Sequence, residues 1–314
     1  MKNTIALLTL TVLSLNVQAG IDGIYGPDNR QDIYQSRSEL HKKLARSTAA
    51  MIHGGHFVKT SQQNVFDIQL GKTLEVGQNI CPTEKFSQQI AVAGCSGFLV
   101  SPDTLVTAGH CYAQTGDQEA NCKNKVWVFD YDMKSEKHDP TKNVSLSNIY
   151  LCKKVVKVGY ANGEDYAIIK LDRKVIGREP LKFRSNGKIT DTTNLVTIGH
   201  PSGLPTKITS AGKITNNNGS DRFSTNLDTF HGNSGSAVFN SQTGVVEGIL
   251  IQGKPDYVPS NKNNSNSCKI ANTCDNDARN CVNDYKSDSA PTRDGEVVYR
   301  ITNIVKEIEA ATRL

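Results

Sequence analysis

Apolar residues beyond position 47 occur in short runs or in alternation, and clusters of Gly, Asn, Asp and Pro separate them. Runs of this kind are typical of β-strands joined by tight turns. Helical stretches do not alternate with the runs, which favours an all-β sandwich or a pair of barrels over a βαβ fold. The clearest predicted strands are 95–100, 126–131, 155–160, 166–171, 195–199 and 245–252.

The pattern changes at the end of the chain. Residues 302–313 place Ile304, Val305, Ile308 and Ala311 on one face at helical spacing, with Lys and Glu on the other. This spacing predicts an amphipathic helix that closes the fold.

Before this helix, residues 259–293 are rich in Asn, Ser and Asp and contain three of the cysteines. Such a composition is typical of a long surface loop that disulfides hold in place of a hydrophobic core. The loop carries Asp275, Asp277, Asp284 and Asp288, but their spacing does not match an EF-hand. We therefore expect no metal site and no cofactor.

The first 46 residues differ from the rest. Residues 1–19 carry the positive charge of Lys2 near the start, continue with an apolar run and end at Ala19, which is the pattern of a secretory signal peptide. The run is too short to cross a bilayer, so we expect a soluble, secreted protein beginning at Gly20, or a periplasmic one if the source has an outer membrane. Residues 20–46 are polar without sustained periodicity and suit a propeptide or an arm lying on a domain formed by residues 47–314.

Composition narrows the class further. Eight cysteines in an exported chain predict disulfides, and the spacing within the sequence leaves most of their pairing open. The formal net charge of +5 is spread along the chain and forms no basic stripe, which argues against nucleic-acid binding.

Three segments supply the side chains that acyl transfer by a serine requires. They are TAGHC at 107–111, DYAIIKL at 165–171 and GNSGS at 232–236. A serine nucleophile needs a base, a carboxylate that orients the base, and donors for the oxyanion. Each segment alone is also ordinary turn or core chemistry.

Taken together and in this order, the segments resemble the histidine, aspartate and serine motifs of chymotrypsin-like peptidases. Enzymes of the α/β-hydrolase class carry the histidine last, which this chain does not. The resemblance implies two six-stranded antiparallel Greek-key barrels packed together. The GNSGS segment is closest to the bacterial branch that includes the glutamyl endopeptidases.

The resemblance also assigns roles. Ser234 would be the nucleophile, His110 the general base and Asp165 the residue that orients the histidine, while the N–H groups of Gly232 and Ser234 would form the oxyanion hole. It further implies a disulfide between Cys95 and Cys111, which would close a loop of about 15 residues and contribute roughly 3 kcal/mol.

The sequence determines less clearly which residues would select the substrate. Asp228 lies six residues before Ser234, where trypsin binds Lys or Arg, but it can equally turn away and leave Thr229 to line the pocket. His231 lies at the pocket rim in the family frame, where it could contact an acidic substrate, although we favour a simply solvated side chain. Ile251 and Gly253 are expected to pair with an extended substrate through their backbones.

Two positions depart from the family. Asn233 stands where chymotrypsin and trypsin have the aspartate that pairs with a new N-terminus, so activation by that ion pair is not expected. Leu250 stands where glutamyl endopeptidases use a histidine, which argues against glutamyl preference. Basic residues near Arg46 suggest processing there.

The predicted function is therefore a secreted serine endopeptidase that acts as a monomer on protein or peptide substrates, without a membrane partner. The alternative is an exported binding or adhesion protein on a catalytically silent peptidase scaffold. Substrate preference, processing site and the partners of the remaining six cysteines stay open.

Overall fold

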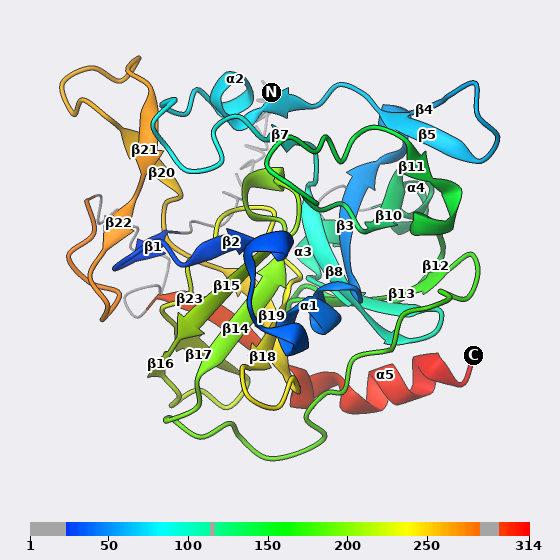
Figure 1. The fold of residues 1–314 in the computed structure, drawn as a ribbon. Coiled ribbons are helices and arrows are strands. Elements are labelled where there is room, and N and C mark those ends of the chain that lie inside the picture. The colour runs from blue at the N-terminus through cyan, green and yellow to red at the C-terminus, as the bar shows by residue number, and fades with distance from the viewer. Residues whose placement is uncertain (1–22, 114–116, 283–294) are drawn as a thin grey trace, which may run out of the picture.

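Six antiparallel strands close into a barrel in the computed structural model, which describes residues 23–113, 117–282 and 295–314. The order around the barrel is β10-β12-β13-β9-β8-β3, and β10 pairs with β3 to close it (Figure 1). The predicted signal peptide at 1–19 lies outside the described residues. The barrel strands are β3 (Thr48–His53), β8 (Cys95–Ser101), β9 (Thr104–Thr107), β10 (Lys125–Phe129), β12 (Ile149–Gly159) and β13 (Tyr166–Leu171).

The second half of the fold is a curled sheet of eight strands in the order β16-β17-β23-β19-β18-β14-β15-β2. The mostly β, chymotrypsin-like architecture is confirmed, but this half differs from the six-stranded barrel that was expected. It has two edges, because β2 from the N-terminal segment adds to β15 at one end and β16 forms the other. Its strands are β2 (Arg30–Asp32), β14 (Leu195–Gly199), β15 (Lys207–Gly212), β16 (Ile214–Asn216), β17 (Arg222–Thr225), β18 (Ala237–Asn240), β19 (Val246–Gln252) and β23 (Glu296–Arg300).

One hydrophobic core joins the two halves. It includes Phe98 and Trp127 from the barrel and Ile198 and Ile249 from the second sheet, none of which is exposed to solvent. Every residue of β13 is buried, as expected for a strand covered on both faces. The site between the halves therefore stands on tightly packed strands.

Short elements decorate these two halves. The small strands are β1 (Ile24–Tyr25) with β22 (Thr273–Cys274), β6 (Lys72–Thr73) with β7 (Ile90–Ala91), β20 (Tyr257–Pro259) with β21 (Lys269–Ala271), and the sheet of β4 (Phe57–Lys59), β5 (Val65–Ile68) and β11 (Val144–Ser145). The helices are α1 (Glu39–Ala45), α2 (Leu74–Gln78), α3 (His110–Ala113), α4 (Gln118–Asn124) and α5 (Val305–Thr312). No helix of the described ranges has the length and apolar character needed to span a membrane.

The C-terminal helix is confirmed. A 3₁₀ turn, Ile301–Ile304, leads into α5, and Ile304, Ile308 and Ala311 are buried. In Figure 1 the helix, drawn in red, runs beneath the barrel.

The N-terminal segment packs on the domain as an arm. Its strand β2 pairs with β15, and β1 runs parallel to β22. Asp32 of this arm forms a 2.6 Å ion pair with Lys207, and both side chains are almost completely buried. The arm is thus held to the second sheet through β2 and to β22 through β1.

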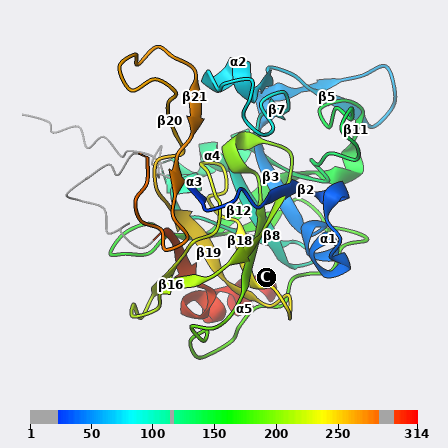
Figure 2. The same cartoon turned by 60° about the vertical axis from the view of Figure 1, so that its left-hand side comes forward.

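The eight cysteines form four disulfides: Cys81–Cys268, Cys95–Cys111, Cys122–Cys152 and Cys274–Cys281. The first of these joins the chain just after α2 to the hairpin β20–β21, and Figure 2 shows the hairpin standing beside α2. Two disulfides involve the loop predicted at 259–293, as its composition suggested.

Candidate active site

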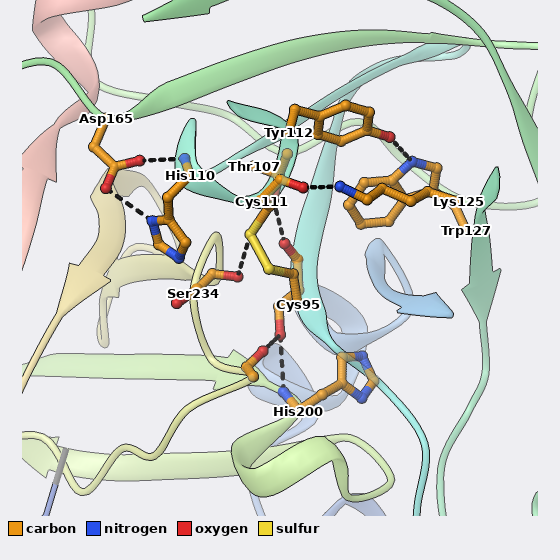
Figure 3. Close-up of a disulfide and its surroundings, with 12 residues drawn as sticks. Cys95, Thr107, His110, Cys111, Tyr112, Lys125, Trp127, Asp165, His200 and Ser234 are labelled. Atoms are coloured by element: carbon orange, nitrogen blue, oxygen red, sulfur yellow. Dashed lines mark hydrogen bonds and ion pairs between the residues drawn. A yellow bond between two sulfur atoms is a disulfide. The ribbon is translucent and has the colours of Figure 1, made fainter. Parts of the chain in front are cut away.

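His110 and Asp165 meet at one edge of the barrel. His110 begins α3, three residues after β9 ends, and Asp165 immediately precedes β13, which pairs with β9. One carboxylate oxygen of Asp165 accepts a hydrogen bond from the backbone N–H of His110 at 2.9 Å, and the other lies 2.9 Å from Nδ1. Asp165 therefore fixes both the main chain and the ring of the histidine (Figure 3).

Ser234 reaches the same place from the second sheet. Figure 3 shows it on the side of the imidazole ring that faces away from Asp165. No hydrogen bond joins the Ser234 hydroxyl to His110 in the described structure. Catalytic hydrogen bonds are often long before substrate binds and shorten in the substrate complex.

Two glycines give the Ser234 loop its shape. Gly232 and Gly235 have φ angles of +85° and +86°, which side chains rarely adopt. A Cβ atom on Gly232 would lie 2.5 Å from the carbonyl oxygen of His200, and one on Gly235 would lie 2.2 Å from that of Ser96. The loop can pass this close to its neighbours only because both positions lack a side chain.

Ser96 of β8 ties the loop to the barrel. Its N–H donates to the carbonyl of Ser234 at 2.8 Å, and its hydroxyl donates to the carbonyl of Gly232 at 2.8 Å. With these two carbonyls held on the barrel side, the N–H groups of Gly232 and Ser234 donate to no described residue. They are the two groups that the resemblance assigns to an oxyanion hole.

The Cys95–Cys111 disulfide is present, as the resemblance implied, with a Cα–Cα distance of 6.4 Å. It joins the start of β8 to the residue after His110, and Figure 3 shows it beside Ser234. Within the described ranges, Cys95, His110 and Cys111 are also the one group of three possible metal ligands. Because the two sulfurs are bonded to each other, they are not thiolate ligands.

Asp228 does not present a free charge to a substrate. Its carboxylate accepts hydrogen bonds from the backbone N–H groups of Tyr25 and Asn29, each at 2.7 Å, and the side chain is buried. Burial raises the pKa of Asp228 to about 7, although the two N–H groups oppose this shift. Asp228 therefore anchors the N-terminal arm, which favours the alternative in which it turns away from a substrate.

The side chain of Thr229 is also hydrogen-bonded within the protein. Its hydroxyl donates to Glu296, which accepts a second hydrogen bond from the hydroxyl of Tyr25. Thr229 and Glu296 are fully buried.

His231 is not simply solvated, contrary to the expectation from sequence. Its Nδ1–H donates to Asp256, and its backbone N–H lies 3.2 Å from each carboxylate oxygen of the same residue. The ring is 42% exposed, whereas the Asp256 side chain is 13% exposed. Burial raises the pKa of Asp256, and the hydrogen bonds from His231 counteract that effect.

Ile251 and Gly253 lie at the end of β19. The pairing of β19 with β23 shifts register between Leu250 and Gln252, so Ile251 lies at an irregularity, and Gly253 follows the last residue of the strand. Their pairing with a substrate backbone stays a prediction.

His200 is a buried structural residue. Its Nδ1 lies 3.1 Å from the carbonyl of Leu204, and its ring stacks on Tyr131 at 5.8 Å. Burial lowers the pKa of His200 to about 3, so the ring is neutral near pH 7.

No sequence pattern pointed to Glu296, Asp256 or Gln78, whose side chains contact Thr229 and His231. None lies in a recognisable motif, and each is distant along the chain from the residue it contacts. Tyr160 was also missed. Its ring centroid is 6.2 Å from that of His110, and its position five residues before Asp165 was the available signal.

Comparisons with known proteins agree with this architecture. A family model described as a trypsin-like peptidase domain matches residues 95–249. No curated protein sequence matches the chain. Among solved structures, an inactivated protease paralogue of the scabies mite has a TM-score of 0.50 and 12% identity, covering 93% of this chain and 97% of that one.

A Glu endopeptidase in complex with MPD has a TM-score of 0.48 and 16% identity, covering 93% of this chain and 100% of that one. At such identities a structural likeness speaks of the fold and not of activity. The family match spans β8 to β19 and includes the histidine, aspartate and serine segments. The chain contains a trypsin-like peptidase domain.

Proposed function

We propose that this protein is an exported serine endopeptidase that hydrolyses peptide bonds through an acyl-enzyme. The observation that carries the proposal is that Asp165 accepts hydrogen bonds from both the backbone N–H and Nδ1 of His110, each at 2.9 Å. Because Nδ1 is bound to Asp165, Nε2 is the ring nitrogen available to Ser234. A carboxylate in this place selects the tautomer that accepts a proton at Nε2.

In the proposed reaction, Ser234 Oγ attacks the scissile carbonyl as Nε2 of His110 takes the hydroxyl proton. The tetrahedral intermediate then collapses, and the imidazolium returns that proton to the leaving amine. His110 then deprotonates a water that attacks the acyl-enzyme. As the bond to Ser234 Oγ breaks, the imidazolium gives this proton to Oγ, and the carboxylic acid leaves. Asp165 stabilises the imidazolium in both steps and does not itself take up the proton.

The N–H groups of Gly232 and Ser234 are proposed to stabilise the oxyanion. Both are free of described acceptors, and Ser96 holds the neighbouring carbonyls away from them. Losing one such donor typically costs about 10²–10³ in rate.

We infer that the enzyme does not select Lys or Arg through Asp228, because the N–H groups of the arm already bind that carboxylate. Protein or peptide substrates would add to the end of β19 at Ile251 and Gly253 by backbone hydrogen bonds. We expect a monomer to be sufficient, since the triad residues all come from one chain.

Export is part of the proposal. Four disulfides are typical of proteins from oxidising compartments, and residues 1–19 have the pattern of a signal peptide.

Processing near Arg46 is a separate prediction. The structure buries Ser47 and bonds the carbonyl of Arg46 to Arg178 at 2.9 Å, so cleavage there requires local opening. Sequencing the N-terminus of active protein tests it, and an active form beginning at Gly20 contradicts it.

The deciding experiment is digestion of an unstructured protein mixture with the purified chain and with a Ser234→Ala control. Mass spectrometry then reads every cut site. We expect cuts that vanish in the control and do not cluster after Lys or Arg, together with labelling of Ser234 by a fluorophosphonate. Absence of both cleavage and labelling would favour the silent binding scaffold, for which the inactivated protease paralogue offers a precedent of fold.

A further inference from the structure

Asp256 holds His231 at both its main chain and its ring. The backbone N–H of His231 lies 3.2 Å from each oxygen of the carboxylate, and Nδ1–H donates to Oδ2. Asp256 follows β19 in the chain, whereas His231 directly precedes Gly232. The contact therefore connects the loop after β19 to the loop that carries the proposed oxyanion donors.

The other end of His231 is held as well. Its carbonyl accepts a hydrogen bond of 2.6 Å from the N–H of Ser202. In a trans peptide the C=O and the following N–H point in opposite directions. With its carbonyl turned to Ser202, the His231–Gly232 peptide must direct the N–H of Gly232 away from Ser202.

Gln78 of α2 bridges these contacts. Its side-chain nitrogen lies 3.1 Å from the carbonyl of Ser202 and 3.2 Å from Nε2 of His231. The hydroxyl of Tyr257, next to Asp256, lies 2.7 Å from that of Ser202. The Cys81–Cys268 disulfide joins the chain just after α2 to the hairpin β20–β21, which begins directly after Asp256.

The hydrogen bonds that hold His231 have a physical purpose at this position. Gly232 has a φ of +85° and no side chain, so it imposes little barrier to rotation of the preceding peptide. A rotated peptide would present the His231 carbonyl in place of the Gly232 N–H, and a carbonyl repels an oxyanion. The orientation must then come from hydrogen bonds outside the glycine.

We propose that Asp256 is a positioning residue for the oxyanion hole, which acts through His231 to keep the Gly232 N–H directed at the substrate carbonyl. This inference rests on the proposed peptidase function. Asp256 touches neither the substrate nor the reacting atoms in this role. Its effect belongs to the transition state, where the oxyanion forms, and not to substrate binding.

The test compares Asp256→Ala, Asp256→Asn and His231→Ala with the wild type, using a peptide substrate identified from the digestion. We expect Asp256→Ala to lower kcat by about 10–100-fold with KM changed by less than about twofold, as for loss of an interaction made in the transition state. His231→Ala keeps the backbone contact with Asp256 and should lose less. Asp256→Asn retains one acceptor for the His231 N–H and should recover part of the loss.

A second readout separates positioning from general damage. The affinity of a peptidyl trifluoromethyl ketone, which forms a tetrahedral oxyanion on serine, should fall in Asp256→Ala by the same factor as kcat/KM. The matched control is Glu247→Ala, which removes a buried carboxylate of β19 that pairs with Arg184 away from the loop. This control should lower the melting temperature without changing kcat.

Each outcome has one meaning. If the wild type is active and Asp256→Ala leaves kcat unchanged, the positioning role is overturned and the peptidase function stays intact. The same conclusion follows if Glu247→Ala lowers activity as much as Asp256→Ala does, or if Asp256→Ala changes KM alone. A wild type without cleavage or fluorophosphonate labelling overturns the peptidase function, and the positioning role with it.

Discussion

The backbone N–H of Tyr25 donates a 2.7 Å hydrogen bond to Oδ1 of Asp228, across 203 positions of the chain. The other carboxylate oxygen accepts from Asn29. The N-terminal arm thus binds both oxygens of the Asp228 carboxylate. A residue with the sequence position of a specificity determinant serves here to attach the arm.

The attachment predicts an unusual pH dependence of stability. Burial raises the pKa of Asp228 to about 7 from an ordinary 3.8, so the folded protein holds a proton that the unfolded chain releases. Its contribution to the free energy of unfolding is therefore fully present below about pH 4 and is lost as the pH rises through 7. Asp228→Asn should flatten this decline, measured as melting temperature between pH 4.5 and 8 in a Ser234→Ala background.

Asp130 provides a control of opposite sign. Burial alone would raise its pKa, but the ion pair with Arg178 outweighs burial and lowers the pKa. The stability that Asp130 contributes is lost as the pH falls, so Asp130→Asn should cost more at pH 8 than at acidic pH. If both variants change stability equally at all pH values, the assignment for Asp228 is wrong.

The hold of Asp165 on His110 predicts the effect of removing its charge. Asp165→Asn keeps the size of the side chain but favours the wrong histidine tautomer, so kcat should fall about 10⁴-fold while the melting temperature changes little. Steady-state kinetics and thermal unfolding measure the two effects. A loss smaller than about tenfold would contradict the role of Asp165.

The buried ion pair between Asp32 and Lys207 predicts how firmly the arm is attached. Asp32→Ala leaves the ammonium of Lys207 buried without its carboxylate, which typically costs about 3–5 kcal/mol. Burial already lowers the pKa of Lys207 to about 8, with Asp32 acting in the opposite direction. Denaturant unfolding at pH 7 should show the loss, and adding Lys207→Met should restore part of it.

The disulfides differ in the loops they close. Cys81–Cys268 spans 187 positions and Cys274–Cys281 spans 7. The chain-entropy model gives roughly 5 kcal/mol for the first and roughly 2 kcal/mol for the second. Paired Cys→Ser variants measured by denaturant unfolding should follow this order, and a larger loss from the short loop would contradict it.

Local patterns carried much of what could be predicted. The strand at 195–199 has the predicted bounds, and Ile304, Ile308 and Ala311 form the buried face of the C-terminal helix. Alternation and turn residues are properties of neighbours in the chain, so they are readable without tertiary structure. The order of the histidine, aspartate and serine segments was readable for the same reason.

One local element escaped the pattern. The helix Glu39–Ala45 lies in a segment without sustained periodicity, yet Ser38 caps it and Leu44 and Ala45 are buried. A helix of this length is marginal alone and draws most of its stability from packing. Its existence therefore depended on the surface against which the arm lies.

The sequence by itself determined the all-β class, the closing helix and the three segments that carry the candidate triad, because short-range periodicity and turn chemistry specify them. Only the tertiary structure decided that Asp228 binds the arm, that Asp256 holds His231 and that Cys81 pairs with Cys268. In each pair the two residues are separated along the chain, or many other residues could have taken the partner's place. Long-range pairing is chosen by the packing of the whole domain, and no local pattern encodes it.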